Sequence, residues 1–175
     1  MPGLLVLAAC TGGPGETQLP PATATPSLLS PSPTPTPTSP SPADPSEAAA
    51  QAAVVRFWKV LDRLSADPKS DLTEIFTVAR GEVADQYIQN ITEYRADRVR
   101  QVGSVAVENL SADRLSKGSR YRVNACLDVS GANIVDEDGK STVSDKRSPR
   151  IRYGYEVLRD SGKWYVVDEQ AGKTC

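Results

Sequence analysis

Three cysteines, Cys10, Cys126 and Cys175, are the residues of this chain best suited to covalent chemistry. A thiol can be acylated, can pair with a second thiol, or can act in redox exchange. The chain contains no histidine. This removes the commonest metal ligand, the commonest general base near neutral pH, and the Ser-His-Asp and Cys-His catalytic systems. The residue types therefore predict no catalytic residue, no metal site and no cofactor.

Cys10 closes a short apolar run over residues 4–9, and residues 7–10 read Leu-Ala-Ala-Cys. Small residues before a cysteine at the end of an apolar stretch form the lipobox that bacterial lipoprotein signal peptidase recognises. The pattern predicts lipid attachment at Cys10 and a signal remnant over residues 1–10. A secretory signal begins with positive charges, yet no Lys or Arg precedes Arg56. We expect the true start to lie upstream; an incidental cysteine is the alternative.

A lipid on Cys10 predicts a protein anchored on the extracytoplasmic face of a bacterial cell membrane, most consistently a Gram-positive one. The apolar run over residues 4–9 is far shorter than the roughly 20 residues that a membrane span needs. The membrane is therefore expected as a partner through the lipid alone.

Cys126 and Cys175 remain as an even pair once Cys10 is assigned to lipid. An even pair is the count expected for an exported domain with one disulfide. Such a bridge would stabilise the domain by about 4 kcal/mol in the chain-entropy model. Two free buried thiols are one alternative. A redox role is another, although the pair lacks the close Cys-x-x-Cys spacing of dithiol catalysts.

Residues 11–43 are rich in proline, threonine and serine, and residues 31–37 read Pro-Ser-Pro-Thr-Pro-Thr-Pro. A stretch with so little to bury favours an extended polyproline II chain. We predict a disordered spacer, with a ligand for proline-recognition modules or a glycosylated stalk as alternatives. The net charge of −2 offers no basic field, so we expect no nucleic-acid partner.

Helical patterns follow the spacer. Residues 44–47 read Asp-Pro-Ser-Glu, an N-cap followed by proline at the first helical position. An apolar stripe that includes Phe57 and Trp58 predicts a helix that continues to about Ser65. Asp71 can cap a short second helix. A third helix is predicted over roughly residues 82–94, and it carries Tyr87 and Tyr94.

After Arg95 the period changes from helical to alternating. Short strands are predicted near residues 104–108, 121–129, 151–157 and 163–167. Asp-Ser-Gly at 160–162 predicts a tight turn between the last two. Asp-Glu-Asp-Gly at 136–139 is similar to a calcium loop, but Ile134 stands at the first ligand position, so we predict a turn there as well. The order of elements predicts an α+β domain over residues 44–175.

This order, closed by Gly-Lys-Trp-Tyr-Val-Val-Asp at 162–168, resembles the nuclear transport factor 2-like superfamily, which includes small exported lipoproteins of actinobacteria. The resemblance implies a cone, in which helices are packed on a curved antiparallel sheet around a pocket. Some members are isomerases or dehydratases, and many others bind ligands or assemble with partners.

Trp58, Tyr87, Tyr94 and Asp128 are the candidate pocket residues. Enzymatic members of the superfamily place an aspartate or histidine base inside the cone, so the resemblance implies Asp128 with Tyr87 or Tyr94 for that role. Edge and core positions are the alternative. We expect a lipid-anchored envelope protein whose domain binds a small apolar ligand or scaffolds an envelope protein. A pocket enzyme of isomerase or dehydratase type, and an adaptor subunit of an export or conjugation machine, are the alternatives.

Overall fold

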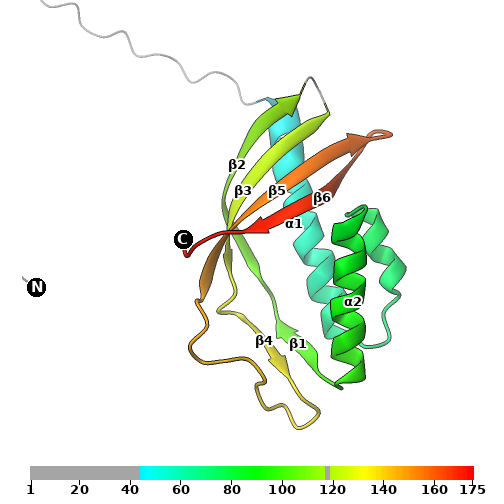
Figure 1. Cartoon of the computed structure of the whole chain (residues 1–175), viewed down its shortest axis with the longest axis vertical. Coiled ribbons are helices and arrows are strands. Elements are labelled where there is room, and N and C mark those ends of the chain that lie inside the picture. Colours follow the sequence, from blue (N-terminus) through cyan, green and yellow to red (C-terminus); the bar gives the residue numbers. More distant parts are fainter. Residues whose placement is uncertain (1–43, 117–118) are drawn as a thin grey trace, which may run out of the picture. The chain divides into compact units, whose positions relative to one another are not determined.

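The computed structural model describes residues 44–116 and 119–175, so Cys10 and the predicted spacer over 11–43 lie outside the described residues. The helices come first: α1 (Pro45–Ala66), the 3₁₀ helix η1 (Leu72–Thr77) and α2 (Glu82–Ala96). Six strands follow: β1 (Arg100–Gly103), β2 (Ala106–Ser116), β3 (Arg120–Asp128), β4 (Ala132–Val135), β5 (Arg150–Asp160) and β6 (Lys163–Ala171). The predicted order, helices before an antiparallel sheet, is confirmed (Figure 1).

Side-chain caps fix where the first two helices begin. The Asp44 carboxylate accepts a hydrogen bond from the backbone N–H of Ser46 at 2.8 Å, and Pro45 occupies the first helical position. The Asp71 carboxylate accepts in the same way from the N–H of Thr73 at 2.9 Å. Each cap satisfies a donor that the first turn leaves without a partner.

Strands β2, β3, β5 and β6 form one antiparallel sheet in that order, while β1 and β4 form a separate two-stranded ribbon. The β5–β6 connection turns at Ser161 and Gly162, whose φ angles are 49° and 79°. Positive φ at both central residues is the requirement of a type I′ hairpin turn. The predicted turn at 160–162 is therefore confirmed.

The strand predicted near residues 104–108 covers the break between β1 and β2 and overlaps only the first residues of β2. At the end of β1, Gly103 has a φ of +75°, and a Cβ there would lie 1.9 Å from the carbonyl oxygen of Gly131. Further along, Asn109 has a φ of 50°, and the β2–β3 register shifts between Glu108 and Ser111. These interruptions break the alternation, so the sequence pattern shows only a fragment of β2.

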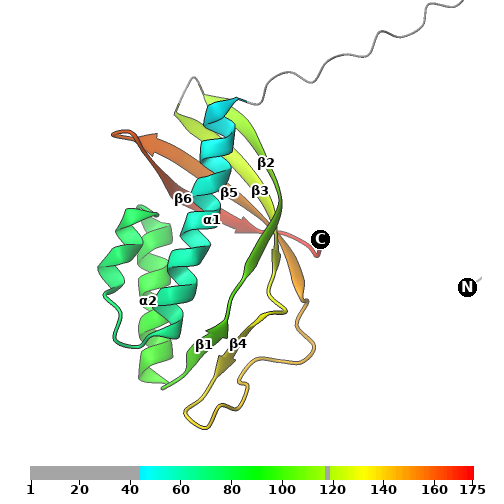
Figure 2. The same ribbon diagram turned by 180° about the vertical axis from the view of Figure 1, so that it is seen from behind.

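All helices cover one face of the sheet. Helix α1 contacts strands β1, β2, β3, β5 and β6, and α2 contacts α1 and β6. Figure 2, seen from behind, shows α1 running along the sheet with α2 beside its lower half. The largest fully buried side chains, Tyr121, Tyr155 and Phe57, lie in the layer between helices and sheet. No helix among the described residues is long and apolar enough to cross a membrane.

Candidate functional site

Five aromatic side chains meet between α1, α2 and β5. Phe57 and Trp58 come from α1, Tyr87 from α2, and Tyr153 and Tyr155 from β5. Alternation along β5 turns both of its tyrosines toward the helices, so that they meet the aromatic residues of the helices. We call these five residues the aromatic cluster.

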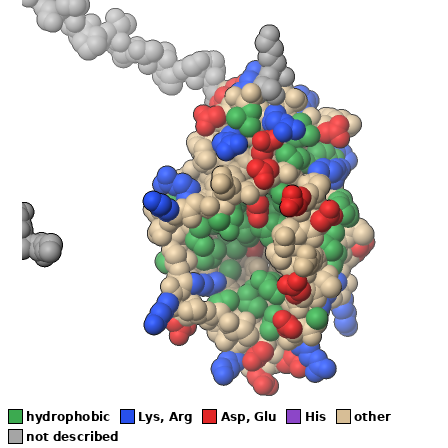
Figure 3. Space-filling model, viewed as in Figure 1, with side chains coloured by type: hydrophobic (Ala, Val, Ile, Leu, Met, Phe, Trp, Pro, Cys, Tyr) green, Lys and Arg blue, Asp and Glu red, His purple; other side chains and the backbone are tan. Residues whose placement is uncertain are grey.

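The rings of the aromatic cluster pack mainly edge to face. The Phe57 and Tyr87 centroids lie 5.3 Å apart at 83°, and Trp58 lies 6.4 Å from both Tyr87 and Tyr153. Tyr153 stacks on Tyr155 at 5.9 Å. Phe57 and Tyr155 are buried, while the other three rings are partly buried. The cluster therefore has a closed back and an open front. Figure 3 shows a hollow, ringed by hydrophobic side chains, between α2 and the strands.

Two hydrogen bonds connect the polar atoms of the cluster. The Trp58 indole N–H donates to the Tyr155 hydroxyl at 2.8 Å. The Tyr87 hydroxyl donates to the Glu169 carboxylate, 3.0 Å from Oε1 and 3.2 Å from Oε2. Glu169 thereby brings a carboxyl group against a surface that is otherwise aromatic.

A bulge in β6 turns Glu169 toward the helices. Val166 pairs with Val157, but the next residue of β5, Glu156, pairs with Asp168 and skips one residue of β6. Glu169 then pairs with Tyr155 and shares its face. In a regular strand, strict alternation from Val166 would place Glu169 on the opposite face.

Burial governs the ionisation of this site. It raises the pKa of Glu169, and the nearby Asp168 charge raises it further, while the hydrogen bond from Tyr87 acts in the opposite direction. Burial also raises the pKa of Tyr87 and of Tyr155, with the Glu169 charge as a further cause in both. Both tyrosine hydroxyls are therefore neutral over the physiological range, and Glu169 is the group that can change its charge.

Glu169 also borders a cleft of about 280 Å³ between the start of α2 and β6. Three of the residues that line this cleft are acidic and none is Lys or Arg: Glu82, Val83, Gln86, Val167, Asp168 and Glu169. Glu169 is thus in contact with a cleft whose lining residues carry no positive charge.

The structure brings two of the four predicted pocket residues, Trp58 and Tyr87, into the cluster. Tyr94 is partly buried near the end of α2, and within residues 44–116 and 119–175 no ring contact joins it to the cluster. Phe57, Tyr153 and Tyr155 of the cluster, and Glu169 beside it, are not among the predicted pocket residues.

Asp128 lies on the opposite face of the sheet, which corrects its expected place beside Tyr87 or Tyr94. Because side chains alternate along β3, Asp128 shares a face with Cys126 and not with the core residues. Its carboxylate accepts hydrogen bonds from the Ser130 hydroxyl at 2.6 Å and the Ser130 N–H at 2.9 Å. These bonds lower the pKa of Asp128. The group therefore caps a local turn and cannot serve as a base in the cluster.

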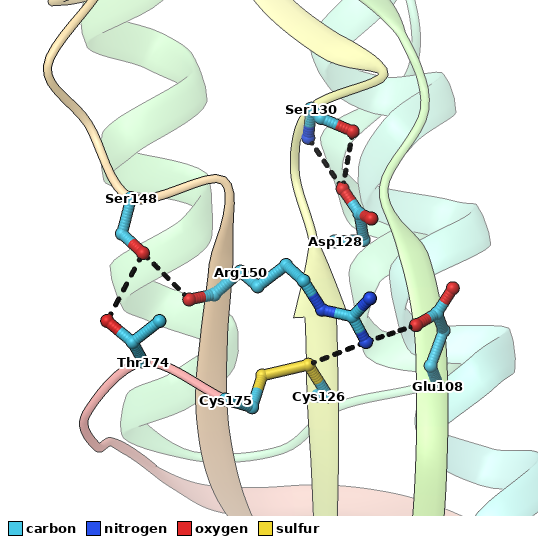
Figure 4. Close-up of a disulfide and its surroundings, with 8 residues drawn as sticks. All are labelled: Glu108, Cys126, Asp128, Ser130, Ser148, Arg150, Thr174 and Cys175. Atoms are coloured by element: carbon cyan, nitrogen blue, oxygen red, sulfur yellow. Dashed lines mark hydrogen bonds and ion pairs between the residues drawn. A yellow bond between two sulfur atoms is a disulfide. The ribbon is translucent and has the colours of Figure 1, made fainter.

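Cys126 and Cys175 lie in disulfide geometry on the sheet face that points away from the helices, with Cα atoms 6.0 Å apart (Figure 4). The tail before Cys175 is held by further contacts. The Gly172 N–H donates to the Arg152 carbonyl at 2.7 Å, and the Ser148 and Thr174 hydroxyls lie 3.3 Å apart. The pair therefore fastens the end of β6 to the middle of the sheet.

No group of three or more His, Cys, Asp or Glu side chains that could hold a metal ion occurs in the part of the chain that the structure describes.

Comparison with known proteins gives a likeness of fold only. No protein-family model and no curated protein matches the sequence. The crystal structure of the intermembrane space region of the chloroplast protein ARC6 is similar, with a TM-score of 0.56 and 17% identity over 73% of this chain and 97% of that chain. A putative scytalone dehydratase from Novosphingobium aromaticivorans has a TM-score of 0.49 and 14% identity over 73% of this chain and 83% of that one.

The predicted fold class is confirmed: this is an α+β domain with helices packed on a curved antiparallel sheet, and the ARC6 region shares this fold. Such a fold is compatible with a binding or pocket module. Any particular activity has to be argued from the aromatic cluster and Glu169.

Proposed function

We propose that the protein is a lipid-anchored binding module of the bacterial cell envelope, whose domain holds a small, largely apolar ligand at the aromatic cluster. The lipid on Cys10 would fix the protein to the membrane, and the spacer would carry the domain away from it. Ligand sites are typically apolar concave surfaces with a few well-placed polar groups, and the cluster with Glu169 meets that description.

The hydrogen bond between Tyr87 and Glu169 is the observation that carries this proposal. A carboxyl group held at the edge of partly buried rings costs stability, because burial disfavours its charged form. A residue retained only for packing would be apolar at this place. A polar anchor for a ligand that also covers the open rings accounts for both the carboxyl group and the exposed aromatic surface.

Nile red, a neutral apolar dye, tests the ligand site. We expect its fluorescence to rise on binding the domain and the rise to be lost in Trp58→Ala, which removes the ring that contacts both Tyr87 and Tyr153. Trp164→Phe is the matched control, because Trp164 packs on Tyr121 outside the cluster. A dye signal that is absent, or that survives Trp58→Ala, would overturn the site.

The anchor is tested separately by intact mass of the protein purified from bacterial membranes. We expect a diacylglyceryl-type addition that Cys10→Ala abolishes. An unmodified secreted protein would contradict the anchor and leave the binding measurements unaffected.

An enzyme of isomerase or dehydratase type is the second candidate, and Glu169 now takes the place that Asp128 was expected to have. The raised pKa of Glu169 beside a tyrosine hydroxyl favours this candidate. Loss of turnover in Glu169→Gln with Nile red binding retained would support the enzyme over the binding module.

A further inference from the structure

We propose that the ligand of the aromatic cluster carries a positive charge, as an ammonium or other organic cation, held by the ring faces and the Glu169 carboxylate. This inference rests on the proposed binding function and adds the chemical class of the ligand. It follows from three features of the described residues: which rings already hold a cation, which charges surround Glu169, and where the ring surface is open.

Arginines of this chain already cover aromatic rings elsewhere. The guanidinium of Arg80 lies 3.7 Å from the Tyr165 ring centroid. Arg114 and Arg159 lie over Tyr121 and Trp164 at 5.4 and 5.9 Å. Within the described ranges, the rings with a cation over them all lie outside the aromatic cluster. The faces of the cluster rings are therefore not occupied by the protein's own positive charges.

Glu169 likewise has no positive partner of its own. Five ion pairs occur in the part of the chain that the structure describes, and none includes Glu169. The groups around it are Tyr87, Tyr153 and Tyr155, with the acidic neighbour Asp168. Glu82 lines the same cleft and is also acidic. Glu169 is half-buried, and partial removal from water disfavours its charge unless a cation lies beside it. A positive charge is therefore the property that the ligand would supply.

Uncovered aromatic rings and an unpaired carboxylate are together what an organic cation needs. Tryptophan and tyrosine rings attract an organic cation through their electron-rich faces, and the attraction strengthens when water is excluded. A carboxylate beside the rings adds a direct charge interaction, which is stronger in a partly buried site than in water. The uncharged part of the ligand would cover the open front of Trp58 and Tyr153.

Three small probes that share a phenyl ring separate charge from apolar contact: benzyltrimethylammonium, benzyl alcohol and phenylacetate. We expect the cation to bind the domain about tenfold more tightly than the alcohol, and phenylacetate to bind more weakly than both. Ligand-observed NMR on the protein gives the three dissociation constants. Equal affinities for the cation and the alcohol would overturn the inference, as would no measurable binding of the cation.

Glu169→Gln keeps the size of the side chain and an acceptor for the Tyr87 hydroxyl while it removes the charge. We expect the preference for the cation over the alcohol to fall by most of its value in this variant. Glu108→Gln is the matched control, because Glu108 pairs with Arg150 at 2.6 Å on the far side of the sheet. An undiminished preference in Glu169→Gln would contradict the assigned role of Glu169.

A pH series checks the same point without a variant. Benzyltrimethylammonium carries a permanent charge, so any change comes from the protein. The facing groups are Tyr87 and Glu82 on α2, Tyr153 and Tyr155 on β5, and Asp168 on β6 itself. Trp58 on α1 does not titrate. We expect cation affinity to fall, and alcohol affinity to stay constant, as pH drops through the raised pKa of Glu169. A flat profile for the cation would count against the inference.

Failure of this inference is distinguishable from failure of the proposed function. If Nile red binds through Trp58 but the cation shows no preference, the binding site stands and the cationic ligand is wrong. If Nile red binding does not depend on Trp58, the binding site itself is wrong.

Discussion

The domain has two aromatic regions, and they are built in opposite ways. Near the start of α1, Tyr121 and Trp164 pack edge to face with centroids 5.5 Å apart, and they are only 0% and 8% exposed. Arg114 and Arg159 cover them from outside. In the aromatic cluster, by contrast, three rings are partly exposed, and the charged group at their edge is the carboxyl of Glu169.

The difference separates aromatic residues that stabilise the fold from those available to a ligand. A ring that is fully buried and capped by the protein's own cation has no surface left to offer. The cluster keeps its apolar surface open and holds a charge that burial disfavours, which is an arrangement that costs stability. Sites that trade stability for binding commonly show this combination.

The largest expected effect is the loss of Tyr121. Tyr121→Ala should lower the free energy of unfolding by about 3–5 kcal/mol, the usual cost of removing a large buried aromatic side chain. Trp58→Ala should cost less, since its ring is partly exposed, but should abolish Nile red binding. Urea unfolding and dye titration measure the two effects. Equal losses of stability in both variants would erase the distinction between the regions.

The disulfide should separate stability from binding more sharply. Replacing both Cys126 and Cys175 by alanine should lower the free energy of unfolding by about 2–4 kcal/mol, because the unfolded chain loses a constraint. Binding of Nile red to the folded variant should be unchanged, since the bridge lies on the far face of the sheet. Weaker dye binding at temperatures where the variant is fully folded would show that the two faces are coupled.

The smallest expected effect has the opposite sign. Because the pKa of Glu169 is raised in the folded domain above its ordinary value of 4.5, the folded state binds the proton more tightly than the unfolded chain. Stability from this group is complete below pH 4.5 and is lost as pH rises through the raised pKa. Glu169→Gln should therefore be slightly more stable than the native protein at neutral pH.

Unfolding free energies of Glu169→Gln and the native protein, measured as a function of pH, test that expectation. The difference should grow in favour of the variant as pH rises above 4.5. Asp62, whose pKa is also raised by burial, is present in both proteins and cancels. Parallel profiles would mean that burial of Glu169 carries no cost.

Much of the fold was predictable because it follows from local signals. The Asp44 and Asp71 caps, the helical stripe and the Asp-Ser-Gly turn each act within a few residues. Short irregular strands were not predictable in the same way. β4 spans four residues and is defined by its pairing with β1, which no local pattern encodes.

The candidate site was predictable only in part, and Glu169 shows why. Trp58 and Tyr87 are aromatic residues on amphipathic helices, so they could be predicted from the sequence. The face that Glu169 occupies depends on the bulge between Val166 and Asp168, and a strictly alternating strand places it outside. The prediction that Asp128 lies in the pocket was wrong for a different reason: regular alternation along β3 turns this residue away from the helices.

The start of α1 at Asp44 and the hollow of the domain lie in different places. Helix α1 begins at Asp44, which pairs with Arg114, and Arg114 covers the Tyr121 ring. Figure 3 shows the hollow lower on the domain, toward β1. The end of the domain where α1 begins is therefore closed by the domain's own side chains. The open rings of the cluster are reached from a different part of its surface.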